Sequence, residues 1–168
     1  MPTLRKFAVP ILAALVLTIA DQWTKTWIVG HFGLYEARAV YENWCHIVHV
    51  RNTGVAFGFL SSLDPAWVNP LLIVTTVLAV AAILGYLHYL PWRGPGPCGL
   101  GLILGGAVGN LIDRARLGYV VDFLDVHWHR YHWPAFNLAD VAITLGIFLL
   151  ILDMLFWSKE GDVAPRTR

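Results

Sequence analysis

The sequence predicts an all-α membrane protein with four transmembrane helices and a small extracytoplasmic β-like platform and loop. Of the 168 residues, 57% are hydrophobic and only 14% are charged, whereas a soluble domain has about 25% charged residues. The eight Trp and six Tyr residues are typical of side chains that anchor a protein at membrane–water interfaces. The length indicates a single integral membrane domain over residues 1–168. The formal net charge of +1 gives no indication of a nucleic-acid partner.

Four apolar stretches are expected to cross the membrane, at approximately residues 9–29, 70–90, 99–112 and 138–157. The first follows Arg5 and Lys6 and also has features of a cleavable secretory signal peptide, with a weak cleavage site after Ala20. We favour a retained helix because the hydrophobic pattern continues to Val29, which provides the ~20 residues that a bilayer requires.

The third stretch, residues 99–112, is short for a bilayer, so its helix is expected to extend further at both ends. It carries Gly101, Gly105 and Gly109 at four-residue intervals. Such a small-residue stripe allows two helices to approach closely.

An even number of membrane spans places both termini on the same side. The twelve Lys and Arg residues divide evenly, six on each side, but the terminal side has them in short segments, where the positive-inside signal is read. We therefore expect the termini and the Pro91–Pro97 turn to be cytoplasmic. The polar segments 30–68 and 113–136 then face outward. The first is expected to be an irregular loop with one β-like segment, His46–Val50.

Two carboxylates, Asp122 and Asp140, stand next to apolar segments, where ionised groups are costly. Two carboxyl groups held close together tend to share one proton. That supplies one base to activate water and one acid to protonate a scissile carbonyl oxygen. The simpler interpretation of Asp122 is a solvated interfacial residue, and that of Asp140 is a helix cap, because Asn137–Asp140 has the pattern of a capping box. Capping and catalysis are compatible, since a helix start is a rigid mount for an acid.

Two further polar motifs have alternative interpretations. Asp113 and Arg114, close to Asn110, place hydrogen-bonding groups near the end of the third span, or they form a neighbouring pair that orients the helix at the interface. Asn52 and Gly54 are typical of a turn. The alternative is an extended segment that offers backbone and amide groups to a bound peptide.

The sequence predicts no metal site and no cofactor. His127, His129 and His132 alternate with aromatic residues and are interpreted as part of an interfacial aromatic belt. The two cysteines, Cys45 and Cys98, lack metal-type spacing. The chain contains neither the HExxH motif of zinc proteases nor the Gly-x-Ser-x-Gly setting of a serine nucleophile.

Taken together, the motifs resemble the bacterial lipoprotein signal peptidases, or type II signal peptidases. Five segments carry the resemblance, in the family's order and over nearly the whole chain: Asp21–Lys25, Asn52–Phe57, Gly105–Arg114, Gly118–Phe123 and Phe136–Asp140. The resemblance implies a four-helix aspartyl peptidase of the bacterial inner membrane that cuts prolipoproteins just before a diacylglyceryl-modified cysteine. It also implies sensitivity to the cyclic peptide globomycin. We expect a monomer in contact with membrane lipid.

The resemblance further implies roles for individual residues. Asp122 and Asp140 would be the catalytic pair. The residues expected to bind substrate or support the pair are Asn52, Gly54, Asn110, Arg114 and Asn137. Those expected to organise the site are Asp21, Lys25 and Asp113. Asp125, three residues after Asp122, lies outside the matched segments.

Two other classes of function stay open from the residues alone. One is a proton- or ion-coupled transporter whose intramembrane carboxylates carry the ion. Four spans are few for a transporter, and the polar residues gather at one face instead of lining a path through the bilayer. The other is a membrane scaffold without catalytic activity. Cleavage of a lipidated prolipoprotein would separate an enzyme from both.

Overall fold

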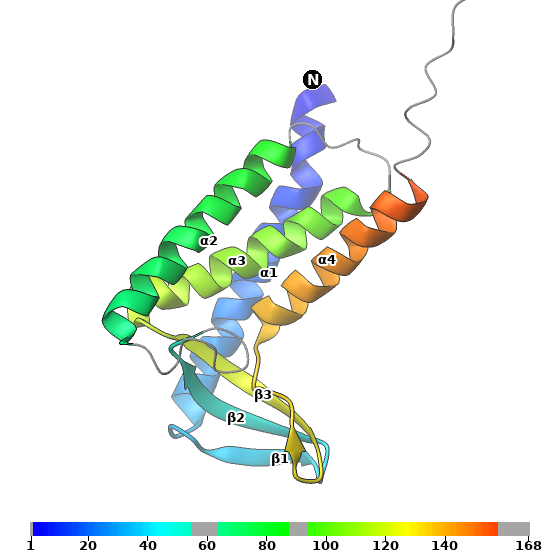
Figure 1. Cartoon of the computed structure of the whole chain (residues 1–168). Coiled ribbons are helices and arrows are strands. Elements are labelled where there is room, and N and C mark those ends of the chain that lie inside the picture. The colour runs from blue at the N-terminus through cyan, green and yellow to red at the C-terminus, as the bar shows by residue number, and fades with distance from the viewer. Residues whose placement is uncertain (1, 55–63, 88–93, 158–168) are drawn as a thin grey trace, which may run out of the picture.

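The structure is a computed structural model that describes residues 2–54, 64–87 and 94–157. Within these ranges it contains four helices long and apolar enough to cross a membrane: α1 (Pro2–His31), α2 (Pro65–Leu87), α3 (Gly96–Leu117) and α4 (Leu138–Phe156). Figure 1 shows them as a bundle with a small sheet at one end. The predicted four-helix membrane fold is confirmed.

The helix ends differ from the expected boundaries for local reasons. α2 begins before residue 70 because the Asp64 side chain accepts a hydrogen bond from the backbone N–H of Ala66, at 2.9 Å. α3 extends beyond 99–112 at both ends, as expected, and closes at Gly118, whose left-handed backbone (φ 80°) only glycine adopts freely. Residues 88–93, which include the end of the expected second span and the start of the Pro91–Pro97 turn, lie outside the described residues.

α3 is the centre of the bundle. It contacts each of the other three helices, and 56% of its membrane-spanning stretch is buried, against 6–22% for the others. The small-residue stripe explains the contact with α1. A Cβ at Gly101 would lie 2.6 Å from the carbonyl oxygen of Pro10, and one at Gly105 would lie 2.7 Å from that of Ala14. The two helices can therefore meet only because these side chains are absent.

The segments expected to be loops instead form a four-stranded antiparallel sheet. In order across the sheet, the strands are β1 (Ala37–Tyr41), β2 (Cys45–Asn52), β3 (Val120–Trp128) and β4 (Tyr131–His132). The predicted segment His46–Val50 lies within β2, but the assignment of the other three strands to loop was wrong. The first four residues of β3 are all buried, so the strand shows no alternation there, and its partner β2 comes from a distant part of the chain.

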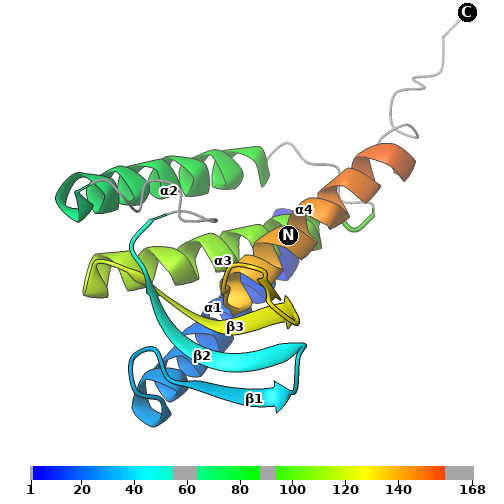
Figure 2. The same cartoon turned by 60° about the horizontal axis from the view of Figure 1, so that its bottom comes forward.

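The sheet lies at the end of the bundle opposite the N-terminus (Figure 1). A hydrophobic cluster joins it to the end of α1, where Ile28 and Phe32 pack against Val121 and Phe123 of β3. Figure 2 shows β2 curving away from the sheet towards α2. The curve coincides with a register shift between Ile47 and Val50, and such irregularities bend a strand.

Candidate active site

The structure brings the two predicted aspartates to one cavity. Asp122 is the third residue of β3 and is 2% exposed, and Asp140 lies in the first turn of α4. Both line a cavity of about 790 Å³ at the sheet end of the bundle, together with Asn52, Asn110 and Arg114. Five of the residues expected in the site, from four different elements or their edges, therefore face the same space.

Two asparagines hold the carboxylate of Asp122. Asn52 donates to its Oδ2 at 2.9 Å, and Asn137 donates to its Oδ1 at 2.7 Å. A buried carboxylate without such donors would be strongly destabilising. The carboxylate is thus fixed from both sides.

Asp140 caps its own helix and still faces the cavity. Asn137 accepts a hydrogen bond from the backbone N–H of Asp140 at 3.0 Å, and the Asp140 carboxylate accepts one from the N–H of Asn137 at 3.2 Å. The predicted capping box is confirmed. The remaining carboxylate oxygen, Oδ1, accepts a hydrogen bond from Asn110 at 2.9 Å. Since Asn137 also contacts Asp122, one amide side chain links the two aspartates.

A buried ionic cluster lies against this pair. Lys25 forms ion pairs with Asp21 at 2.9 Å and Asp113 at 3.0 Å. Asp21 accepts the backbone N–H of Ala139, and Asp113 accepts that of Val121. These are the residues immediately before Asp140 and Asp122. The cluster therefore holds the backbone next to each aspartate.

Lys25 also orients Asn110. Its ammonium, which can only donate, hydrogen-bonds the carbonyl oxygen Oδ1 of Asn110 at 2.9 Å. Asn137 donates to the same oxygen at 3.3 Å. The amide nitrogen of Asn110 is left to face Asp140, so the amide has one orientation that satisfies all three partners.

Arg114 and Asn52 also line the cavity, and both contact Gly54. Arg114 donates to the carbonyl oxygen of Gly54 at 3.2 Å, and Asn52 accepts the N–H of Gly54 at 3.0 Å. Asn52 is the last residue of the extended strand β2, and its amide group also donates to Asp122. Asp113 and Arg114 have separate partners, because Asp113 pairs with Lys25 and Arg114 bonds the backbone of Gly54. Residues 55–57 of the same motif lie outside the described residues.

Gln22 is a site residue to which the sequence pointed without assigning it a role. Its amide nitrogen donates to Asp113 at 2.8 Å and to the carbonyl oxygen of Gly109 at 3.1 Å. The available signal was its place between Asp21 and Lys25, near one end of an apolar helix.

Burial, and to a smaller extent the nearby charge of Asp140, raise the pKa of Asp122 from 3.8 to about 7. The hydrogen bonds from Asn52 and Asn137 act in the opposite direction but are outweighed. A carboxyl group with a pKa near 7 exchanges its proton at the pH at which most enzymes work. Asp122 can therefore hold and exchange a proton at neutral pH.

The histidines of the β3–β4 hairpin do not reach the cavity. His127 and His132 gather with His46 around Asp125, while His129 lies at the hairpin turn and bonds to the backbone of Asn43. Within the part of the chain that the structure describes, His46, Asp125 and His127 are the group with metal-ligand spacing. These residues do not line the cavity of the two aspartates.

The fold and the site are those of a multi-pass membrane protein with buried carboxylates and amides beside a cavity at one end of the helix bundle. A family model described as Signal peptidase (SPase) II matches residues 13–156. The chain belongs to the signal peptidase II family, and the resemblance drawn from its motifs is confirmed.

Similar proteins align with this chain over nearly its full length. The lipoprotein signal peptidase of Syntrophotalea carbinolica is 47% identical over 150 residues, covering 89% of this chain and 92% of that protein. That of Geobacter sulfurreducens is 44% identical over 165 residues, covering 98% and 99%. A solved structure of a bacterial membrane enzyme superposes with a TM-score of 0.79 at 28% identity, covering 95% of this chain and 93% of the other.

Proposed function

We propose that the protein is a membrane aspartyl endopeptidase that removes the signal peptide from prolipoproteins, cutting before the diacylglyceryl-modified cysteine. The observation that carries this proposal is the placing of Asp122 and Asp140 on one cavity, with Asn137 bonded to both. Membership of the signal peptidase II family and the name of the relatives, lipoprotein signal peptidase, support the substrate class.

In this mechanism the two aspartates hold one proton between them. The ionised carboxylate takes a proton from water while the water oxygen attacks the scissile carbonyl carbon. The protonated carboxyl gives its proton to the carbonyl oxygen, which forms a tetrahedral diol. One hydroxyl of the diol then returns a proton to the ionised aspartate. The other aspartate protonates the departing nitrogen, so the C–N bond breaks and the pair is restored.

The pKa of Asp122, raised by burial to about 7, supports this role because it keeps a proton in the pair at neutral pH. The neighbouring amides fix the orientation of both carboxylates. Arg114 lines the same cavity and donates to the backbone of Gly54. It therefore places a positive charge beside the reacting atoms and holds the protein's own backbone at Gly54 next to them.

The cavity also suits a substrate that arrives from the bilayer. Its wall along α4 includes the apolar residues Val141, Ile143 and Leu145, and Leu145 is 51% exposed on the surface of the bundle. An apolar signal helix with a lipid on its cysteine can enter on this side without leaving the membrane. Water can reach the aspartates from the sheet end.

This chemistry belongs on the outer face of the bacterial inner membrane. The N-terminus lies at one end of the bundle and the sheet at the other (Figure 1). Residues of β2 and β3 line the cavity, together with α3 and α4. In the sequence, short segments rich in Lys and Arg adjoin the spans on the side of the termini, which supports cytoplasmic termini and an external site. We propose that the protein works there as a monomer in contact with lipid.

The proposal is tested with purified protein in lipid nanodiscs and two forms of one prolipoprotein, with and without the diacylglyceryl group. The expected result is a size shift on a gel for the lipidated form, and mass spectrometry should place the modified cysteine at the new N-terminus. Globomycin should abolish the shift.

Two results would contradict the proposal. One is equal cleavage of the unlipidated form, because the cavity is proposed to receive lipid and peptide together. The other is a cut at a different bond in the lipidated form.

A further inference from the structure

Four polar side chains gather on one face of the sheet, apart from the cavity of the aspartates. His46 of β2 lies opposite Asp125 of β3, and His127 of β3 lies opposite His132 of β4. Asp125 and His127 are two residues apart in a strand, so their side chains point to the same side. Register and alternation therefore bring one carboxylate and three imidazoles together.

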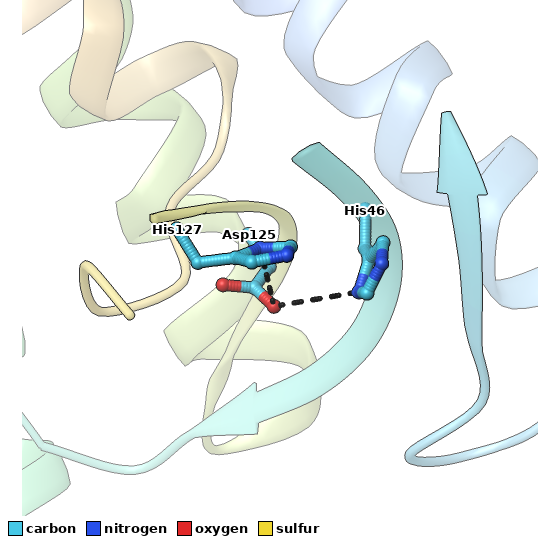
Figure 3. A group of neighbouring side chains, drawn as sticks. All are labelled: His46, Asp125 and His127. Carbon is cyan, nitrogen blue, oxygen red and sulfur yellow. Dashed lines mark ion pairs between the residues drawn. The ribbon is translucent and has the colours of Figure 1, made fainter. Parts of the chain in front are cut away.

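Three of these side chains converge on a common point. The Nδ1 atoms of His46 and His127 lie 3.9 and 3.8 Å from the same oxygen, Oδ2 of Asp125. One ligand atom from each of the three residues lies within 4.8 Å of the others. Figure 3 shows both contacts ending at that oxygen.

The buried Nδ1 atom of His127 indicates that a bound cation is missing from this group. The His127 side chain is 3% exposed, and its Nδ1 is buried without a hydrogen-bond partner among the described residues. An unpartnered buried polar atom typically costs about 1–3 kcal/mol. A cation at the common point would accept the lone pair of this nitrogen and would also neutralise the carboxylate.

The donor set selects the kind of cation. Two imidazole nitrogens and one carboxylate oxygen suit zinc, which binds such atoms at about 2.0–2.2 Å with tetrahedral geometry. Ligand atoms around such an ion are ~3.3 Å apart, so the nitrogen–oxygen separations of 3.8 and 3.9 Å need to close by about half an ångström, and the whole group, which lies within 4.8 Å, has to contract around the ion. The third histidine, His132, lies 3.0 Å from both oxygens of Asp125, where it can hold the ligating carboxylate from outside.

We propose that His46, Asp125 and His127 form a zinc site that ties β2 to β3. The same two strands carry Asn52 and Asp122 towards their other ends, so the ion would stabilise the platform on which one aspartate is mounted. The site takes no part in the peptidase chemistry, and its existence does not depend on that chemistry. Sequence spacing did not indicate it, because His46 and Asp125 meet only through strand pairing.

Cobalt binding tests the proposal directly. The protein is purified with a tag that contains no histidine, treated with a chelator and titrated with Co²⁺ in detergent. We expect a visible absorption band that saturates at one equivalent and disappears when Zn²⁺ is added. His127→Asn and His46→Asn should each weaken binding by about 10-fold or more.

His129→Asn is the matched control. His129 is on the same hairpin but outside the group, and its backbone (φ 55°) is one that asparagine tolerates. This variant should bind cobalt like the unchanged protein. If His127→Asn fails to fold, His46→Asn carries the test, because the His46 side chain is 27% exposed and packs less tightly.

Thermal unfolding is the second readout. Zinc at saturating concentration should raise the Tm of the unchanged protein and of His129→Asn by about 3 °C or more, and should leave that of His46→Asn unaltered. The proposal is overturned if the unchanged protein binds no cobalt at concentrations up to about 1 mM, because a Kd above that value means only weak binding. It is equally overturned if His129→Asn loses binding as fully as His46→Asn.

Discussion

At the scale of the residue, Asp140 is a helix cap that is also proposed to be a catalytic acid or base, two roles that are compatible. It occupies position N3 of the capping box that begins at Asn137, and it faces the cavity shared with Asp122. A cap is worth about 0.5–2 kcal/mol, whereas a general acid or base contributes about 10²–10⁴-fold in rate. The two roles therefore predict different consequences of the same substitution.

Asp122→Asn and Asp140→Asn should each lower the cleavage rate by about 10²-fold or more. The double variant should be little worse, because the two groups act as one unit. Rates are measured per folded protein, with folding checked by thermal unfolding. If Asp140 were only a cap, its variant would lose activity in proportion to the loss of folded protein. Asp64→Asn, the same change at an exposed helix start outside the cavity, should keep full activity.

The raised pKa of Asp122 also predicts a pH dependence. Its folded-state pKa is about 7 against 3.8 for the ordinary group, so the folded state binds the proton more tightly than the unfolded state. The contribution of this group to stability is fully present below about pH 4 and is lost as the pH rises to about 7. Cleavage should also decline above about pH 7, as the pair loses its shared proton.

The measurement is thermal unfolding between pH 4 and pH 8, compared for the unchanged protein and Asp122→Asn. The stability of the variant relative to the unchanged protein should increase through this window, because asparagine carries no proton to lose. Parallel profiles for the two proteins would show that Asp122 has an ordinary pKa.

At the scale of the element, the α1–α3 contact sets the position of the ionic cluster. Gly109 of α3 faces Asp21 of α1, and a Cβ at that position would lie 2.5 Å from the Asp21 carboxylate. Asp21 pairs with Lys25 and holds the N–H of Ala139. A displacement of Asp21 would therefore reach the start of α4, where Asp140 is mounted.

Gly109→Ala should destabilise the protein by about 1–3 kcal/mol, the usual effect of overpacking, and should reduce cleavage per folded molecule. Gly85→Ala is the matched control, since a Cβ there meets nothing within 4 Å. Because alanine favours a helix over glycine by about 1 kcal/mol, the control should unfold at the same or a higher temperature. Equal effects of the two changes on Tm would contradict the proposed role of the close contact.

At the scale of the whole molecule, the first helix is part of the bundle along its length. Pro10 and Ala14, in its first half, pack against Gly101 and Gly105 of α3. Its second half carries Asp21 and Lys25 into the site. We therefore expect the mature protein to retain this helix, and intact-mass measurement checks it. A mature chain that lacks residues 1–20 would contradict this expectation.

The orientation of the molecule is a separate prediction. Reporter fusions at the C-terminus and within the Pro91–Pro97 turn should behave as cytoplasmic, because short segments rich in Lys and Arg stay inside. Fusions within residues 113–136 should behave as external. Activity of a periplasm-dependent reporter at the C-terminus would reverse the orientation.

The sequence by itself determined the features that depend on local spacing and composition. Apolar length predicts the four spans, because backbone groups in a bilayer require continuous helices. The pairing of Asp21 with Lys25 and the capping box of Asn137 with Asp140 follow from spacings of four and three residues in a helix. These parts of the candidate site could be predicted because both partners lie within one turn.

Only the tertiary structure decided which residues meet across the chain. Asn52 reaches Asp122 over 70 positions, and Asp21 reaches Ala139 over 118. The pairing of β2 with β3 was also decided by the tertiary structure. The start of β3 is buried on both faces and shows no alternation of apolar and polar residues, so the local sequence does not indicate the pairing. The grouping of His46 with Asp125 depends on that pairing. Such contacts arise from the register of strands and the packing of helices, which a local pattern does not encode.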